Sequence, residues 1–212
     1  MRVVITGGPS SEPIDEVRVL TNRSTGELAL ALFERFTAAG HEVELFLGQG
    51  AHHRPPEARP FERNEDLQAL LAAVSDPQRV RLVLHAAALS DFSAVPVDAE
   101  GAAVRRAKIA SRAEGVRLLL VPKPKLLVRL RDFFPNAFLV GWKLEHDGSL
   151  PELIETARQQ IHANRLDASV INGRAYGAGL GFCTNTGLIH RAGTKAELAD
   201  FLVLLAGRGF RT

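Results

Sequence analysis

The sequence predicts an α/β fold in which helices wind over both faces of a mostly parallel sheet. Short apolar runs typical of buried strands alternate with stretches whose leucines and phenylalanines recur at helical spacing. Polar or glycine turns separate them, as in doubly wound folds with right-handed crossovers. The chain has 212 residues, 46% of them hydrophobic, which is enough to bury one core. We therefore expect a single domain over residues 1–212.

The expected elements follow in order along the chain. Strands are expected over residues 2–6, 42–47, 80–88, 116–121, 138–142 and 168–172, the last of them being the final core strand. Helices are expected over residues 24–39, 64–74, 125–134, 150–164 and 195–207. Two stretches do not fit this alternation, residues 49–61 and 92–114, and both are expected to be surface loops or arms.

Composition argues against several classes of protein. The formal net charge is only +2, and one Trp and one Tyr offer little for stacking on bases, so nucleic-acid binding is not indicated. We find no signal peptide and no run long enough to cross a membrane. Cys183 is the only cysteine, which excludes an internal disulfide, and we interpret it as a loop thiol. A cytoplasmic protein fits best.

Two glycine-bearing turns near the N-terminus are the most informative feature. The first strand ends in Gly7 and Gly8, and a second polar turn then opens the first helix. Such turns let backbone N–H groups approach phosphate or carboxylate closely, although Gly7 and Gly8 could equally well only shape a tight turn. The dinucleotide fingerprint and the P-loop are both absent. A short-chain reductase would need a lysine four residues after Tyr176, where Leu180 stands.

The second turn carries a more specific pattern. Asn22 alone could be an N-cap for the following helix. Together with Arg18, Ser24 and Gly26, however, it resembles the phosphopantothenoylcysteine synthetase signature, G-[GP]-[TS]-x-x-x-[IL]-D-x-V-R-x-[IL]-[ST]-N-x-S-[ST]-G. The match runs from Gly8 to Gly26.

Further pieces resemble the same family in the expected order over almost the whole chain. They are the run from His85 to Phe92, Lys108-Ile109-Ala110-Ser111, Pro124-Lys125-Leu126-Leu127, Gly141-Trp142-Lys143-Leu144-Glu145, Asn172 and Lys195. The chain is thus similar to the C-terminal half of the DNA/pantothenate metabolism flavoprotein. The K-I-x-S and G-[FW]-K-L-E variants are typical of the free-standing synthetase.

The resemblance implies a Rossmann-like fold with a protruding dimerisation arm. It implies a ligase that joins 4′-phosphopantothenate and L-cysteine in coenzyme A biosynthesis, through an acyl nucleotide made from a nucleoside triphosphate with release of pyrophosphate. Of the two nucleotides that the family uses, CTP and ATP, we expect CTP as co-substrate, together with Mg²⁺. A homodimer through residues 92–120 is expected, in which the arm completes the partner's site.

The resemblance also implies roles for individual residues. Catalysis is assigned to Asn22 and Lys108, with no protein metal site. Nucleotide binding is assigned to Gly7, Gly8, Asp91, Lys108, Pro124, Lys125, Leu126, Leu127 and Trp142. Substrate binding is assigned to Arg18, Asn22, Ser24, Gly26, Ala87, Ala88 and Asn172. Taken singly, Lys108 could be solvated, Asp91 a turn former and Trp142 a core aromatic.

Some positions depart from the family pattern, and other functions stay open. Many members have glycine where Ala29 stands, and fused enzymes have lysines where Gln160 and Asn164 stand. His52 and His53 are interpreted as surface residues, because they lack nearby partners at metal-ligand spacing. A nucleotide-binding module that serves a separate flavoprotein decarboxylase, or a Rossmann-type oxidoreductase, remain the alternatives.

Overall fold

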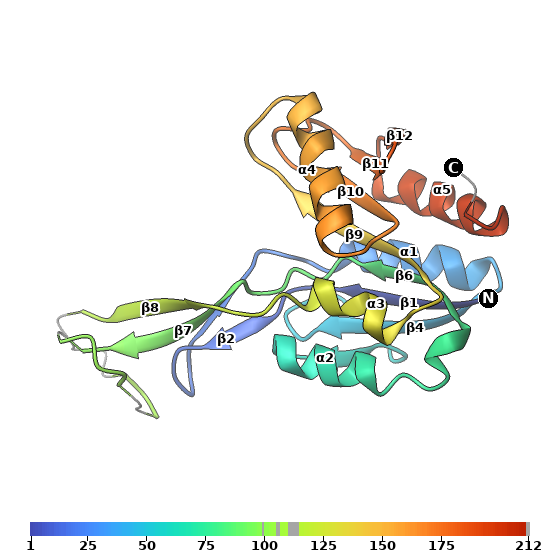
Figure 1. Cartoon of the computed structure of the whole chain (residues 1–212). Helices are drawn as coiled ribbons and strands as arrows, with labels where there is room; N and C mark the ends of the chain where they lie inside the picture. Colours follow the sequence, from blue (N-terminus) through green and yellow to red (C-terminus); the bar gives the residue numbers. More distant parts are fainter. Residues whose placement is uncertain (99, 105–106, 110–114, 211–212) are drawn as a thin grey trace.

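The computed structural model describes residues 1–98, 100–104, 107–109 and 115–210. Its centre is an eight-stranded sheet in the order β12-β11-β10-β9-β6-β1-β4-β5 (Figure 1). The neighbours from β10 to β5 run parallel, whereas β11 and β12 are antiparallel. The mostly parallel, doubly wound sheet is therefore confirmed. Its strands are β1 (Arg2–Gly7), β4 (Glu42–Gly48), β5 (Arg59–Phe61), β6 (Val80–His85), β9 (Phe138–Leu144), β10 (Ala168–Asn172), β11 (Leu180–Thr184) and β12 (Gly187–Ala192).

Helices cover both faces of this sheet. They are α1 (Glu27–Ala38), α2 (Asn64–Ala72), α3 (Leu130–Phe133), α4 (Leu150–Ala163) and α5 (Lys195–Gly207), with 3₁₀ turns at Pro77–Arg79 and Leu126–Arg129. The helices α1 and α5 share one hydrophobic cluster, and α2 and α3 belong to another. Within the described ranges, none of the helices combines the length and apolarity needed to cross a bilayer.

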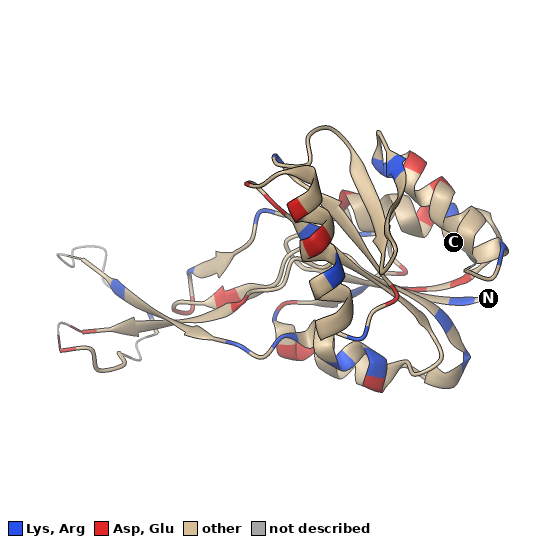
Figure 2. Cartoon of the chain, turned by 45° about the horizontal axis from the view of Figure 1, so that its top comes forward, with Lys and Arg blue, Asp and Glu red and all other residues tan. Residues whose placement is uncertain are grey.

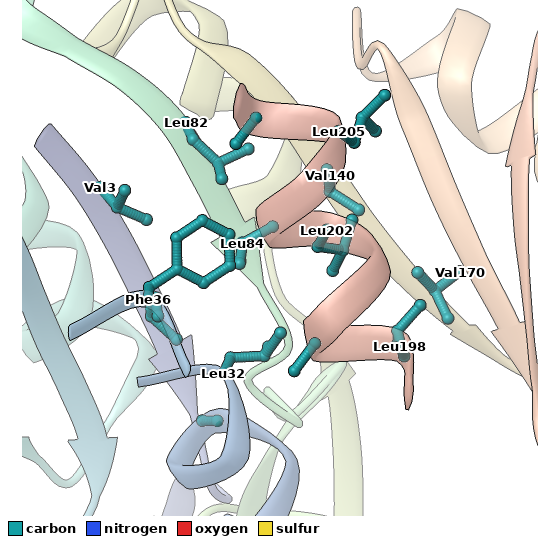
Figure 3. Packing of buried hydrophobic residues seen from close by; sticks show 14 of the residues in the cluster. Val3, Leu32, Phe36, Leu82, Leu84, Val140, Val170, Leu198, Leu202 and Leu205 are labelled. Atoms are coloured by element: carbon teal, nitrogen blue, oxygen red, sulfur yellow. The ribbon is translucent and has the colours of Figure 1, made fainter. Parts of the chain in front are cut away.

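The larger cluster shows why the strands are continuously apolar. Leu32 and Phe36 of α1 and Leu202 of α5 form one cluster with Val3 and Leu84 of the sheet, and the Phe36 ring lies between Val3 and Leu84 (Figure 3). These side chains are at most 1% exposed. A parallel sheet covered on both faces buries both sides of each strand, so the apolar runs do not alternate with polar residues.

The two central strands lie where the direction of strand order changes. The chain places β4 on one side of β1 and β6 on the other, which makes their carboxyl ends the switch point of the sheet. Pairing continues beyond both strands, since the Ala88 N–H donates to the Gly8 carbonyl at 2.9 Å and the Ser10 N–H to the Ala88 carbonyl at 3.2 Å. The turn after β1 is thereby joined to the segment after β6.

Several expectations about the elements need correction. The first helix begins at Glu27, and its N-cap is Gly26 with φ +78°, so Asn22 is not the cap. Residues 49–61 contain the short strand β5. Residues 125–134 form a 3₁₀ turn followed by a single helical turn rather than one helix. In each case the local pattern is too short to reveal which partner the backbone finds in the fold.

The chain also continues the sheet after residues 168–172, which periodicity had indicated as the final core strand, although in the family that the sequence resembles the glycine-rich segment 173–181 precedes a hairpin. A glycine-rich segment leads into β11 and β12, which add an antiparallel hairpin to the edge of β10. Cys183 lies in β11 and is fully buried beside Leu153, Ala157 and Ile171, so it is not a loop thiol. Burial raises the pKa of this thiol to about 11, and Cys183 is therefore a core residue.

An antiparallel arm projects from the domain (Figure 1). It consists of β7 (Phe92–Val97) and β8 (Arg117–Pro122), and a small hairpin of β2 (Ser11–Pro13) and β3 (Val19–Thr21) lies at its base. Residues 116–121 were thus correctly predicted as mainly extended, but they pair outside the main sheet. All six residues of β8 are exposed, although the sequence resembles a buried strand.

Charge distinguishes the arm from the rest of the surface. In the view of Figure 2, residues of both signs are scattered along the helices, whereas the two arm strands are mostly uncharged. A buried ion pair fixes the base of the arm, where the Lys123 ammonium contacts Glu12 of β2 and lies 2.9 Å from Glu65 of α2. The arm is thus anchored by charge at its base and is apolar along its length.

Candidate functional site

Two adjoining cavities lie at the carboxyl ends of the parallel strands. Lobe 1, of about 460 Å³, lies among the ends of β6 and β9 and the segment 124–127. Lobe 2, of about 380 Å³, lies among the turn after β1, the start of α1 and the end of β10. Both lobes share five lining residues, which we call the junction: Arg23, Ala87, Ala88, Trp142 and Leu144. This is where doubly wound folds bind ligands.

Lobe 1 brings together most of the residues that the sequence analysis assigns to the nucleotide. The Lys125 ammonium lies 3.8 Å from the carboxylate of Asp91, and both side chains are more than 60% exposed. The predicted residues in this lobe are Asn22, Ala87, Ala88, Asp91, Pro124, Lys125, Leu126, Leu127 and Trp142.

Polar side chains fix the loop that carries Asp91. The Asn22 amide Nδ2 donates to the carbonyls of Ala88 and Leu89 at 3.2 and 3.0 Å. The Asn64 Nδ2 donates to the Ser90 carbonyl at 2.8 Å. These bonds come from different elements and hold the loop with Asp91 at the cavity.

Lobe 2 brings together the glycine turns and the start of α1. The predicted residues that line it are Gly7, Gly8, Ser24, Gly26, Ala87, Ala88, Trp142 and Asn172. Gly7 and Gly8, which were assigned to the nucleotide, therefore lie with the substrate residues. Gly26 needs to be glycine, because its φ is +78° and a Cβ there would lie 2.9 Å from Ala51 Cβ. The N–H groups and dipole of α1 favour an anion here.

Two predicted residues, Arg18 and Lys108, line neither lobe. Arg18 lies 2.5 Å from the Asp15 carboxylate and donates to the Ile109 carbonyl at 3.3 Å. The Ile109 N–H donates to Asp15 at 3.0 Å and is the main reason why the Asp15 pKa falls to about 2. Lys108 is therefore held near the base of the arm, with an exposed side chain. Ser111 of its motif lies outside the described residues.

Trp142 is both a core residue and part of the cavity wall. Its ring packs against the larger core cluster and lines both lobes. The Gln160 Nε2 donates to the Trp142 carbonyl at 3.1 Å and the Ser169 hydroxyl to Gln160 Oε1 at 2.6 Å. Gln160 thus links β9 to β10 at the wall of lobe 1. Asn164 lies outside both lobes, and its Nδ2 donates to the Gln160 carbonyl at 2.8 Å.

Histidines take two different positions. His52 and His53 are exposed, and the described residues contain no group of three or more His, Cys, Asp or Glu side chains arranged to hold a metal. His85, which sequence analysis did not assign to the site, forms part of the lobe 1 wall and is 6% exposed. Its Nδ1 lies 2.7 Å from Thr6 Oγ1. The signal for it was its place at the start of the run from His85 to Phe92.

Acid should destabilise the protein through His85. Burial lowers the pKa of His85 to about 4, whereas an exposed histidine titrates near 6.5. Above pH 6.5 the histidine is neutral in both the folded and the unfolded chain and costs no stability. As the pH falls toward 4 only the unfolded chain takes up the proton, so the free energy of unfolding falls by about 3 kcal/mol. The free energy of unfolding of His85→Gln, measured by urea denaturation, should vary less over this pH interval. If the free energy of unfolding changed with pH equally in the wild type and in His85→Gln, the buried His85 would not be the source of the acid sensitivity.

Comparison with known proteins agrees with this architecture. A family model described as the DNA/pantothenate metabolism flavoprotein C-terminal domain matches residues 1–201. The coenzyme A biosynthesis bifunctional protein CoaBC of Thermococcus kodakarensis is 33% identical over 174 residues, which cover 81% of this chain and 41% of that protein. The chain thus spans less than half the length of this relative.

Solved structures show the same likeness. The crystal structure of the DNA/pantothenate metabolism flavoprotein from Streptococcus pneumoniae has a TM-score of 0.85 at 26% identity, covering 98% of this chain and 99% of that one. A Cab2 variant in complex with phosphopantothenate-cysteine has a TM-score of 0.70 at 15% identity, covering 99% and 87%, which shows the shared fold. This chain belongs to the family of the DNA/pantothenate metabolism flavoprotein C-terminal domain.

Proposed function

We propose that the chain is a ligase that joins 4′-phosphopantothenate and L-cysteine in coenzyme A biosynthesis. The observation that carries this is the pair of lobes that meet at one junction, each large enough for part of an extended ligand. A relative is named for coenzyme A biosynthesis, and a structural neighbour holds phosphopantothenate-cysteine, which supports the choice of substrates.

The lobes suggest where each substrate binds. The nucleotide would occupy lobe 1, near Asp91 and the segment 124–127, with Trp142 beside it. The phosphopantothenate would occupy lobe 2, with its phosphate near the start of α1 and with Ser24, Gly26 and Asn172 around it. Gly7 and Gly8, which line lobe 2, would then contact the acyl nucleotide at its phosphopantothenoyl part.

The reaction would proceed in two displacements. A carboxylate oxygen attacks the α-phosphorus, a new O–P bond forms, and the bond to the bridging oxygen breaks, so that pyrophosphate leaves with the electron pair. The cysteine amine then attacks the acyl carbon, the C–N bond forms, the nucleoside monophosphate leaves and the amine loses a proton to solvent. Mg²⁺, carried by the nucleotide, would neutralise phosphate charge. The residues mainly provide positioning and charge neutralisation.

Asn22 is suited to hold the acyl nucleotide. Because its Nδ2 faces the carbonyls of Ala88 and Leu89, the oxygen of the same amide is the group left for substrate. This oxygen can accept a hydrogen bond from the incoming cysteine amine or from a hydroxyl of the acyl nucleotide, which would favour the second displacement.

The arm supports a homodimer. Phe92, Leu119 and Leu120 are 44%, 53% and 47% exposed, and Val17 and Val19 at the base of the arm are 65% and 48% exposed. Apolar patches of this kind mark interaction surfaces. We propose that the exposed apolar strands of two arms pair in the dimer, and that Lys108, which lies near the arm base outside both lobes of its own chain, serves the other subunit's site.

Turnover tests the proposed function. The protein is incubated with 4′-phosphopantothenate, Mg²⁺ and CTP or ATP, with and without cysteine, and pyrophosphate release and product mass are measured. We expect an amide product that depends on cysteine, with CTP preferred over ATP. No pyrophosphate and no product with either nucleotide would contradict the ligase and favour a binding module that serves a separate flavoprotein decarboxylase.

A further inference from the structure

Most cations that line the two lobes face a carboxylate. The Lys125 ammonium lies 3.8 Å from Asp91, and the Lys143 ammonium lies 3.1 Å from Glu145. Lys195 is hydrogen-bonded to Glu27 at the start of α1. Each of these charges is already partly neutralised before a ligand arrives.

Arg23 differs from them in position and in its contacts. It lines both lobes, at the junction where they meet. Its side chain forms no ion pair and no hydrogen bond within the part of the chain that the structure describes. An exposed guanidinium group with five N–H donors thus stands at the boundary of the two lobes, with no carboxylate partner among the described residues.

The backbone on both sides of Arg23 is held in place. On one side, the Asn22 amide is bonded to the carbonyls of Ala88 and Leu89, and the Thr21 hydroxyl donates to the Ser10 carbonyl at 2.8 Å. On the other side, Gly26 starts α1. The chain therefore carries Arg23 across the junction between two fixed points, which limits where its side chain can reach.

We propose that Arg23 is a catalytic residue that binds the anionic centre formed when the substrate carboxylate meets the α-phosphate. This rests on the proposed ligase function, which brings these two anions together at the junction. A guanidinium can donate to a phosphate and a carboxylate at once, and its charge opposes their repulsion. The signature that the chain resembles leaves this position unrestricted, so the resemblance does not assign Arg23 a role.

The charge on the phosphoryl oxygens and the developing pyrophosphate changes during the first displacement, and Arg23 should act mainly there. We expect Arg23→Ala to lower the single-turnover rate of acyl-nucleotide formation about 100-fold, as loss of one charge-stabilising donor does elsewhere. The KM for the nucleotide should change much less. Arg23→Lys should retain more activity than Arg23→Ala, and added guanidinium chloride at non-denaturing concentration should restore part of the alanine variant's rate.

Two controls accompany this experiment. Arg208→Ala removes an exposed arginine at the other end of α5 from Lys195 and should leave the rate unchanged. Thermal unfolding of each variant shows that it is folded. Wild-type turnover tests the ligase separately, because an inactive wild type would refute the proposed function itself. An active wild type together with an unimpaired Arg23→Ala, or a loss confined to KM, would overturn the role of Arg23 alone.

Discussion

Replacing Lys108 with alanine should lower turnover by at least about 100-fold. Pairing this variant in a dimer with the equally inactive variant Asn22→Ala should restore part of the turnover. Lys108 lies near the arm base and lines neither lobe of its own chain, whereas Asn22 lines lobe 1. If Lys108 serves the other subunit of a dimer, each site combines Asn22 of one chain with Lys108 of the other. The variants Lys108→Ala and Asn22→Ala would then complement each other.

The two variants are co-expressed with different affinity tags, and the heterodimer is purified through both. One of its two sites has an intact Asn22 and an intact Lys108, so we expect about half of the wild-type rate. A heterodimer of wild type and the double variant would also keep one lysine and one asparagine, but on the same chain, and should be inactive. If instead this pairing is active and the first is not, Lys108 serves its own subunit.

Gly7→Ala should be among the most destabilising single substitutions in the chain. A Cβ at Gly7 would lie 2.2 Å from Ala29 Cβ, where β1 meets the first turn of α1, and Ala29 is 1% exposed. Overpacking of this kind costs about 3 kcal/mol. The double variant Gly7→Ala, Ala29→Gly exchanges the positions of one methyl group and should recover most of this loss, as measured by urea denaturation.

Ala29→Gly alone should cost about 1 kcal/mol through helix propensity. Gly207→Ala, in α5, is the matched control, because a Cβ there would meet nothing within 4 Å. If the double variant were no more stable than Gly7→Ala, the contact with Ala29 would not explain the need for glycine. Ala29 would then owe its place to the cavity, since it also lines lobe 2.

The alternation of apolar runs and helical segments was sufficient to predict the main sheet, because burial on both faces leaves a strong local pattern. It misplaced residues 116–121, since an exposed apolar strand has the same composition as a buried one. It missed β11, where two short strands follow a glycine-rich stretch. What closes a sheet edge depends on contacts far apart in sequence, which periodicity does not contain.

For the candidate site too, local motifs predicted some residues, whereas contacts between distant segments could not be predicted. Motifs identified Asn22, Asp91 and the segment 124–127, which the structure brings to one cavity from separate elements. They did not reveal His85, which becomes a cavity wall only when β6 is placed beside β9. Nor could they show that Arg18 would bind Asp15 and Ile109 rather than line a lobe. Residue types can suggest chemistry, but the neighbours of each group follow from topology.

The pairing between Gly8 and Ala88 has a consequence for how substrates arrive. It extends the contact between β1 and β6 beyond their ends, to a place where Ala87 and Ala88, which have small side chains, line both lobes. Under the proposed assignment, each ligand has its own chamber and neither lies across the other's route. The two substrates could then bind in either order before they meet at the junction, and steady-state kinetics should show a random mechanism.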